Sequence, residues 1–351
     1  FGQGQPFIFS PCFKIVSRNK DFNQFFAIVF IGNIFYFIFF IQGCDFINNK
    51  GKFLGPFYCI LAAVVWGLSF VAQSEGASIG TFTFNGIRTL IGGIVLVPLV
   101  FIEHMSENKK LPAGEKKKFA FRDVLIGGFC CGIPLFLGGN LQQHAFFLDL
   151  GPGKVGFITA LYMVLVPVAG IFLKRKLHFN IWLGVALGVV GLYLLSVPSG
   201  GFTIGKGEVI AICGAFAFTA LILVIDYFCQ KVNNIALSCC QFFVAGIFSI
   251  ICMFIFEEPN IGDIMSAAMP ILYAGVMSCG VAFTAQIFGQ KYTNPTVASV
   301  LLCLESVFAV IFGLIFLNDK LNSRETIGCV VMFTAIMLTQ IPFEKFKLKA
   351  K

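Results

Sequence analysis

The sequence predicts an all-α, polytopic membrane protein with ten transmembrane helices arranged as two inverted five-helix repeats. Apolar residues make up 58% of the 351-residue chain and charged residues only 12%, and the mean hydropathy is +0.89. From about Tyr58 onward, the chain is a series of apolar stretches long enough to cross a bilayer as helices. These stretches form two similar sets of five. Because each set is odd in number, the second must enter the membrane with the opposite orientation.

The continuity of the apolar stretches argues against other classes of protein. A soluble domain needs far more polar surface than this composition supplies. The strands of a membrane β-barrel alternate apolar and polar residues, which these stretches do not. Because every backbone amide in hydrocarbon needs an internal partner, stretches of this length are expected to be helices. The net charge of +8 does not indicate nucleic-acid binding, since the basic residues cluster in short loops beside the stretches.

In chain order, the predicted helices are ten stretches of about 17–24 residues. The first repeat supplies five of them, at 57–73, 82–102, 124–146, 154–173 and 180–197. The second repeat supplies the other five, at 207–228, 235–256, 267–288, 294–317 and 324–341. Pro and Gly mark the connections, as at Gly151-Pro152-Gly153 and Asn294-Pro295. The longest connection, about 103–123, carries the run Lys116–Lys118 and is interpreted as a hydrophilic loop.

The distribution of Lys and Arg sets the expected orientation. If the end before the first stretch is cytoplasmic, 17 Lys and Arg fall on the cytoplasmic side and 4 on the opposite side. Cytoplasmic loops of membrane proteins carry the excess of basic residues. We therefore expect a multi-pass protein of the cell membrane, with both ends of the ten-helix body in the cytoplasm.

Residues 1–50 fit this scheme poorly. The Phe-rich apolar stretch at 25–41 is long enough to be an eleventh helix, but the basic residues before it would then lie outside, against the charge bias. The chain starts without Met, and its first methionine is Met105, beyond the second apolar stretch. We interpret 1–50 as an atypical N-terminal extension and expect that residues 1–46 are not native to the helical body. A genuine extra helix is the alternative.

Four segments carry a family resemblance. They are Ala62–Phe70, Asn85–Arg88, Gly153–Tyr162 and Ala298–Ala309. In this order and spacing, the chain resembles the drug/metabolite transporter superfamily over about 57–341, in the group built of two EamA domains. The internal correspondence agrees, because Trp66 falls opposite Phe218 and Arg88 falls opposite Gln241. The chain departs from the family pattern at Ser306, where many members have proline, which predicts a straighter ninth helix.

The resemblance implies a first EamA repeat at 51–198, a second at 199–343 and a basic cytoplasmic tail at 344–351. It also implies that helices one to four and six to nine surround a central cavity, with helices five and ten at the periphery. The implied activity is the movement of small metabolites without ATP. The sequence agrees in having no P-loop, and we expect no enzymatic activity and no cofactor.

Glu305 lies inside an apolar helix. A carboxylate there is costly unless it faces a cavity, finds a partner or takes a proton. A carboxyl that takes up and releases a proton would suit a proton-coupled carrier. A structural carboxyl that is hydrogen-bonded across helices is the alternative, and the residues leave both open.

Arg88 lies about two turns into the second apolar stretch. Its guanidinium could attract an anionic group or pair with an acid. The alternative is that the side chain extends to the outer interface while its stem stays in the membrane. Nothing in the sequence joins Arg88 to Glu305.

Amide side chains recur near the ends of the third and eighth stretches. With their polar neighbours they are Asn140, Gln142, Gln143 and His144 in the third stretch and Gln286 and Gln290 in the eighth. Such groups can bind a ligand or join helices. Because both repeats carry them, we favour cavity lining. A lone histidine such as His144 is more often a structural group than a titrating one.

Trp66 and Tyr162 are the aromatic candidates for the cavity. Both lie in segments that carry the family resemblance. Ordinary packing among the 45 phenylalanines is the alternative.

Other motifs receive structural interpretations. Residues 151–156 match GxGxxG, but no βαβ unit surrounds them. Ser69 lies in a GxSx sequence similar to that of intramembrane serine proteases. That chemistry needs a base positioned on the serine, and the repeat pattern explains Ser69 without it. The 13 cysteines form no CxxC or Cys/His set, so no metal site is expected. Gly184, Gly188 and Gly191 permit close packing of the fifth helix, within the protomer or in a homodimer.

The sequence thus predicts a secondary transporter that exports small metabolites or drugs by alternating access. Glu305 is the first candidate for coupling, and the amides and aromatic residues are the candidates for substrate contact. The expected partners are a small-molecule substrate and the lipid bilayer, with a homodimer left open. The alternative function is a non-transporting membrane assembly or sensing subunit.

Overall fold

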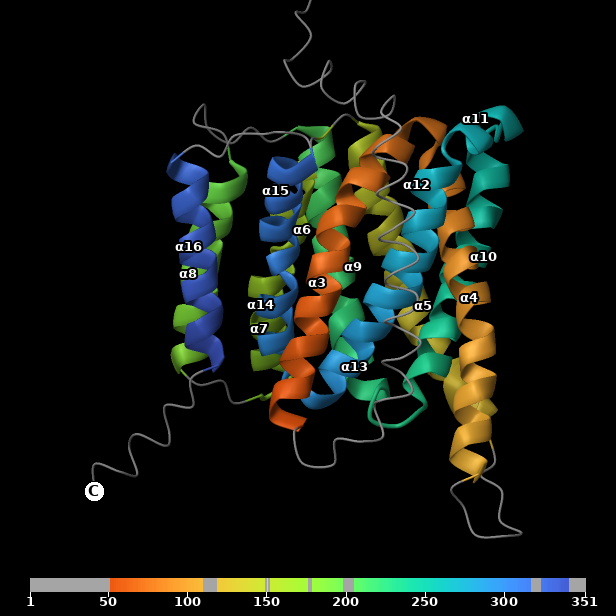
Figure 1. Ribbon diagram of the computed structural model, residues 1–351, viewed down its shortest axis with the longest axis horizontal. Coiled ribbons are helices and arrows are strands. Elements are labelled where there is room, and N and C mark those ends of the chain that lie inside the picture. The colour runs from red at the N-terminus through yellow and green to blue at the C-terminus, as the bar shows by residue number, and fades with distance from the viewer. Residues whose placement is uncertain are drawn as a thin grey trace, which may run out of the picture.

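The computed structural model describes residues 51–109, 119–148, 150, 152–175, 179–197, 205–316 and 323–340 (Figure 1). These residues form an all-helical bundle without strands. The predictions for the extension at 1–50 and the tail at 344–351 lie outside the described residues. In Figure 1, the short helix α11 lies at the upper end of the bundle and α13 at the lower end.

The helices follow the order expected from the apolar stretches. The first half forms α3 (Gly51–Glu75), the 3-10 turn η2 (Gly76–Ile79), α4 (Thr81–Lys109), α5 (Phe121–Phe147), α6 (Pro152–Thr159), α7 (Tyr162–Phe172) and α8 (Phe179–Ser196). The second half forms α9 (Lys206–Phe228), α10 (Asn234–Phe256), α11 (Ile261–Ser266), α12 (Ala268–Tyr273), the π-helix η3 (Ala274–Phe283), α13 (Thr284–Tyr292), α14 (Pro295–Leu302), α15 (Leu304–Phe316) and α16 (Ser323–Gln340).

Asparagine side chains fix several helix starts. The Asn233 amide oxygen accepts from the backbone N–H of Ala236 at 2.8 Å and begins α10. Asn294 accepts from Thr296 at 3.0 Å, and Pro295 occupies the first position of α14. Such caps satisfy backbone donors that the helix itself leaves unpaired, and proline loses nothing at a first helical position.

Seven helices in the described ranges are long and apolar enough to cross a membrane. Shorter apolar helices, at Ile181–Leu194, Pro295–Ala309 and Thr326–Ile336, lie in the other three predicted stretches. The all-helical, multi-pass class predicted from the sequence is therefore confirmed, while the count of ten spans stays a prediction.

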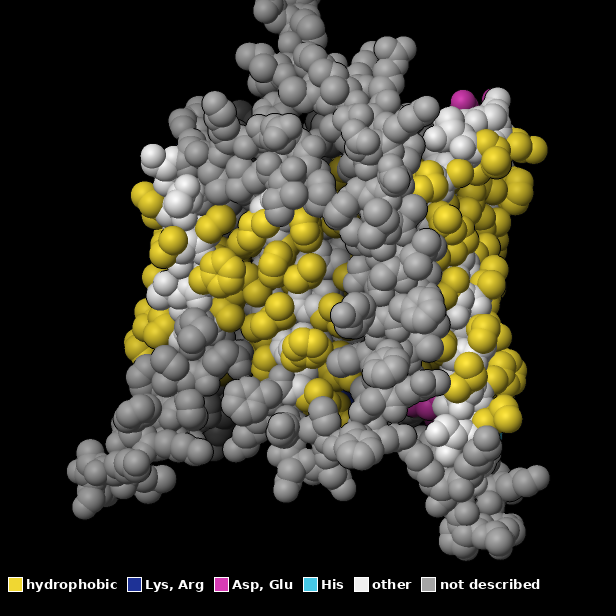
Figure 2. Space-filling view, in the orientation of Figure 1, with side chains coloured by type: hydrophobic (Ala, Val, Ile, Leu, Met, Phe, Trp, Pro, Cys, Tyr) yellow, Lys and Arg dark blue, Asp and Glu magenta, His cyan; other side chains and the backbone are white. Residues whose placement is uncertain are grey.

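The outer surface of the bundle is strongly apolar. Large side chains such as Phe172, Phe179, Phe254 and Phe256 are each at least 70% exposed. Figure 2 shows hydrophobic side chains over most of the described surface on the side facing the viewer. A soluble monomer rarely exposes such extended apolar patches, so this surface fits contact with lipid chains.

Two of the predicted continuous helices are interrupted. The stretch 154–173 breaks at Ala160 and Leu161, between α6 and α7, and the stretch 294–317 breaks at Cys303, between α14 and α15. The expectation that the ninth helix is straighter than in family members stays a prediction. The backbone N–H of Ser306 bonds to the carbonyl of Cys303 at 3.2 Å, so a tighter turn interrupts the helix without proline.

Helices at the same position in the two halves pack against each other. The second helices, α4 and α10, are in contact, as are the fourth, α7 and α14, and the fifth, α8 and α16. Other extensive contacts also cross between the halves. Helix α3 packs against η3 and α13, and α9 packs against α5. The buried core therefore lies where the two halves meet.

The glycines of α8 serve packing within the chain. A Cβ atom at Gly191 would lie 2.9 Å from the backbone nitrogen of Met332 and 3.1 Å from the carbonyl oxygen of Gly328, both in α16. A Cβ at Gly188 would lie 2.8 Å from the Met163 side chain. The sequence left open whether these glycines pack within the protomer or in a homodimer. Packing within the protomer accounts for Gly188 and Gly191, and a homodimer stays a prediction.

Candidate functional site

The described halves of the chain enclose a central cavity of about 570 Å³, a volume that includes its open approach. It is lined from α3, α4, α5, α6, α7, α9, η3, α13, α14 and α15. The lining side chains are Trp66, Phe70, Gln73, Arg88, Leu135, Gly139, Gln142, Thr159, Tyr162, Phe218, Leu221, Ile222, Ser278, Phe283, Gln286, Leu302 and Glu305. Both helix interruptions reach it, because Thr159 and Tyr162 flank one break and Leu302 and Glu305 flank the other.

The structure brings six of the nine sequence-predicted site residues to this cavity. They are Trp66, Arg88, Gln142, Tyr162, Gln286 and Glu305. The other three, Gln143, His144 and Gln290, lie outside the lining.

Gln143 and Gln290 join helices in matching ways. The amide nitrogen of Gln143 donates to the carbonyl of Gln73 in α3 at 2.9 Å, and that of Gln290 donates to the carbonyl of Ile222 in α9 at 2.9 Å. Both side chains are buried, and the amide oxygen of each lacks a hydrogen-bond partner in the described structure. These two glutamines therefore connect helices across the edge of the cavity.

His144 also has a local structural setting. Its Nδ1 lies 3.2 Å from the hydroxyl of Thr81, and its ring stacks on Phe147 at 5.7 Å. These contacts lie near the upper ends of α4 and α5. The imidazole thus joins the start of α4 to the end of α5.

Glu305 and Tyr162 meet at the cavity wall. The Tyr162 hydroxyl donates to the Glu305 carboxyl at 3.3 Å, and these two residues are 143 positions apart in the chain. The same separation joins the Cys303 thiol to the carbonyl of Ala160, at 3.5 Å. Glu305 is 5% exposed, and no cation forms an ion pair with it among the described residues. A buried carboxyl with one long hydrogen bond is poorly compensated as an anion.

Arg88 is also buried, at 5% exposure, and lies inside the bundle. Its Nε donates to the Asn85 amide oxygen at 2.6 Å, and its guanidinium carbon lies 5.6 Å from the centre of the Phe84 ring. No ion pair joins Arg88 to Glu305 in the described ranges, although both line the same cavity. The cavity therefore contains a guanidinium and a carboxyl that are not paired with each other.

Aromatic rings form much of the remaining wall. Trp66 packs edge-on against Phe283 at 4.7 Å, and Phe283 packs edge-on against Phe242 at 5.6 Å. The indole N–H of Trp66 has no hydrogen-bond partner in the described structure. The wall thus combines a large apolar area with an unused donor.

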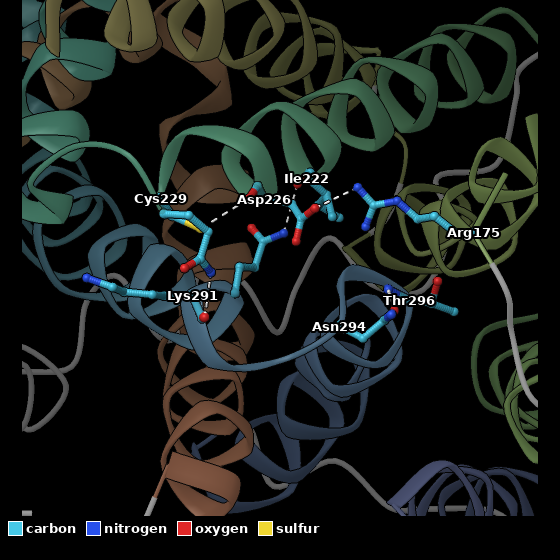
Figure 3. Close-up of polar contacts among 9 residues, drawn as sticks. Arg175, Ile222, Asp226, Cys229, Lys291, Asn294 and Thr296 are labelled. Atoms are coloured by element: carbon cyan, nitrogen blue, oxygen red, sulfur yellow. Dashed lines mark hydrogen bonds and ion pairs between the residues drawn. The ribbon is translucent and has the colours of Figure 1, made fainter. Parts of the chain in front are cut away.

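Polar contacts join helices at the lower end of the bundle (Figure 3). The Arg175 guanidinium pairs with the Asp226 carboxylate at 2.7 Å, joining the end of α7 to α9. The side-chain amide of Gln230 donates to the carbonyl of Lys291 at 2.6 Å, joining the end of α9 to α13.

A carboxylate joins the halves at the upper end. Glu257, which follows α10, accepts from the backbone N–H groups of Phe82 and Thr83 at 2.9 and 2.8 Å and from the Thr83 hydroxyl at 2.7 Å. It therefore caps the start of α4 from the end of α10. Gly80 leaves room for the carboxylate, because a Cβ there would lie 2.6 Å from a Glu257 oxygen. The φ of +103° at Gly80 is also a conformation that favours glycine.

Sequence reasoning missed several of these residues. Phe70 and Gln73 lie four and seven positions after Trp66, which is helical spacing along one face and would have identified them. The roles of Glu257 and Asp226 had no local signal, since their partners lie far away in the chain. In the described ranges, no group of three His, Cys, Asp or Glu side chains is placed to hold a metal ion.

Comparison with known proteins finds one family across most of the chain. The EamA-like transporter family matches residues 53–197 and 205–341. A protein of Archaeoglobus fulgidus, named an uncharacterized transporter, is 29% identical over 80% of this chain and 84% of its own length. A WAT1-related chloroplastic protein of Arabidopsis thaliana is 24% identical, over 84% of this chain and 71% of its own. YoaV of Bacillus subtilis, also named an uncharacterized transporter, is 22% identical over 82% and 97%.

A solved crystal structure has a similar fold. It superposes with a TM-score of 0.66 at 18% identity and covers 81% of this chain and 95% of its own. At this identity, the likeness extends to the fold alone.

Proposed function

The chain belongs to the EamA-like transporter family, and we propose that it is a secondary transporter that exports a small molecule across the cell membrane. The central cavity would hold the cargo, and the two halves would rock around it in alternating access. The lower end of the bundle would face the cytoplasm, as the distribution of Lys and Arg predicts.

One observation carries this proposal. Corresponding residues of the two halves line the same cavity in pairs. Tyr162 corresponds to Glu305, since each lies ten positions after the proline that opens its helix segment. Trp66 corresponds to Phe218 and, by the same spacing, Phe70 to Ile222. A cavity shared in this way between two inverted repeats is where a carrier binds its cargo.

The two halves contribute different residues to the cavity lining, and this asymmetry supports alternating access. Gln73 and Arg88 line it, but their counterparts Ile225 and Gln241 are fully buried outside it. Gln73 and Arg88 lie toward the upper ends of α3 and α4, and the contacts of Figure 3 lie at the lower ends of α7, α9 and α13. In the opposite state, those lower contacts would break and the region around Gln241 would open.

Glu305 is the proposed coupling residue. It is buried in the cavity wall, where the Tyr162 hydroxyl donates to it, and a proton would remove the cost of its charge. Uptake of this proton from one side and release to the other would couple the cycle to a proton gradient.

The test compares metabolites released by cells that make the unmutated chain and cells that make Glu305→Gln. Glu258→Gln is the control, because Glu258 is exposed outside the cavity. We expect at least one compound to accumulate in the medium with the unmutated chain and the control but not with Glu305→Gln. Equal release by all three, with each protein folded in the membrane, would exclude Glu305 as the coupling residue. Release no different from cells lacking the chain would favour the assembly or sensing alternative.

A further inference from the structure

Building on the proposed function, we propose that Arg88 binds a carboxylate of the cargo. The cavity would then select small organic monoanions that have an apolar body and also carry hydrogen-bond donors. Four features of the described residues support this assignment: how Arg88 is held, its lack of an acidic partner, its isolation as a cation, and the unused polar atoms around it.

A chain of hydrogen bonds holds Arg88 in place. Asn85 accepts from the Arg88 Nε, and the Asn85 amide nitrogen donates to the carbonyl of Gly139 at 2.8 Å and to the amide oxygen of Asn140 at 3.2 Å. Asn140 in turn donates to the Ser249 hydroxyl at 2.8 Å. These hydrogen bonds join α4, α5 and α10, so both halves of the protein fix one edge of the guanidinium. This pre-organisation reduces the ordering cost of binding a ligand.

The outer nitrogens of Arg88 have no hydrogen-bond or ion-pair partner among the described residues. No carboxylate pairs with the guanidinium there, and the Phe84 ring centre lies 5.6 Å from its central carbon. An arginine inside a membrane protein is costly without an anion, and such residues mark substrate pathways. The planar guanidinium presents parallel N–H groups that match a carboxylate in a bidentate pair.

The lining favours a monoanion over a more highly charged group. Arg88 is the only Lys, Arg or His among the described lining residues, so one positive charge is present. A doubly charged phosphate would keep an uncompensated charge in this site, whereas a carboxylate would not. The rings of Trp66, Phe70, Phe218 and Phe283 leave an apolar space for the body of the ligand.

Two hydrogen-bond acceptors that have no partner among the described residues indicate that the ligand also carries a donor group. The amide oxygens of Gln73 and Gln286 line the cavity and are buried without a hydrogen-bond partner in the described structure. Leaving such acceptors unpaired is costly, so a ligand that donates to them gains affinity. A hydroxyl or N–H group beside the carboxylate supplies that donor.

Trp66 provides a direct readout of ligand binding. The sequence contains two tryptophans, and Trp182 lies in α8 outside the cavity lining. Trp182→Phe therefore leaves Trp66 as the only indole. We would titrate the purified full-length chain with 3-phenylpropanoate, with its neutral amide 3-phenylpropanamide, and with 3-phenyllactate, which adds a hydroxyl, and follow Trp66 emission.

We expect 3-phenylpropanoate to bind about 10- to 100-fold more tightly than its amide, and phenyllactate to bind more tightly still. Arg88→Gln should remove the preference for the carboxylate. Arg122→Gln is the matched control and should keep it, since Arg122 is exposed at the start of α5. A preference that survives Arg88→Gln would overturn the proposal.

The unmutated chain also tests the proposal alone, should Arg88→Gln fail to fold. Equal binding of carboxylate and amide, including binding of neither, would overturn it. The outcomes separate this inference from the proposed function. A chain that prefers carboxylates but exports nothing would refute export and keep the subsite. A chain that exports only neutral or cationic compounds would refute the subsite and keep export.

Discussion

Replacing Glu257 by alanine should destabilise the bundle strongly, although Glu257 lies at its periphery. The change removes one carboxylate that accepts three hydrogen bonds, at 2.7–2.9 Å, from Phe82 and Thr83. Thr83 is fully buried, so its N–H and hydroxyl would lose their partner where water cannot easily replace it. Loss of a helix cap costs about 0.5–2 kcal/mol, and a hydrogen bond to a charged group contributes about 1.5–3 kcal/mol.

Because Glu257 is only partly buried, we expect a combined loss of about 2–4 kcal/mol in the free energy of unfolding. The assay is reversible unfolding of the purified chain in mixed micelles with increasing sodium dodecyl sulfate, followed by circular dichroism. Glu258→Ala, one position along the chain and exposed, is the matched control and should change stability by less than about 0.5 kcal/mol. A Glu257→Ala loss no larger than that of the control would refute the view that this carboxylate joins α10 to α4.

Two further predictions use the same unfolding assay. Gly191→Ala should cost about 1–3 kcal/mol, because the new Cβ would lie 2.9 Å from the α16 backbone. Gly170→Ala should be nearly neutral, because a Cβ there would lie 3.8 Å from the Arg175 side chain. Equal effects would mean that α8 and α16 are less closely packed than described. Arg175→Ala and Asp226→Ala should show a coupling of about 0.5–1 kcal/mol in a double-mutant cycle, since both side chains are partly exposed. Strictly additive losses would exclude a working ion pair at the lower end.

The sequence predicted the helices well because their cause is local. Continuous apolar stretches must satisfy their own backbone in a membrane, and residues such as Asn294 and Pro295 mark helix starts wherever the chain then goes. The breaks at Ala160 and Cys303 were missed because no glycine or proline marks them in the sequence. There, the Cys303 thiol bonds to the carbonyl of Ala160 across the interface.

The sequence predicted which residue types form the candidate site, but not which of their side chains face the cavity. Gln142 and Gln143 are neighbours with the same side chain, yet one lines the cavity and the other bonds to the backbone of α3. Successive residues of a helix point about 100° apart, and only the positions of the surrounding helices decide which of the two faces a ligand. Glu305 and Arg88 stood out from the sequence because charge inside a membrane is rare, whatever the packing.

The central claim is that cargo passes through the cavity between the halves. Leu302→Trp places an indole in that cavity, where Leu302 forms part of the wall. Leu183→Trp makes the same change on α8, at a side chain that is 40% exposed outside the cavity. The measurement is the release of a compound that the unmutated chain exports, from cells making each variant at equal membrane levels. The account predicts that Leu302→Trp abolishes release and Leu183→Trp preserves it. Undiminished release by folded Leu302→Trp would contradict it.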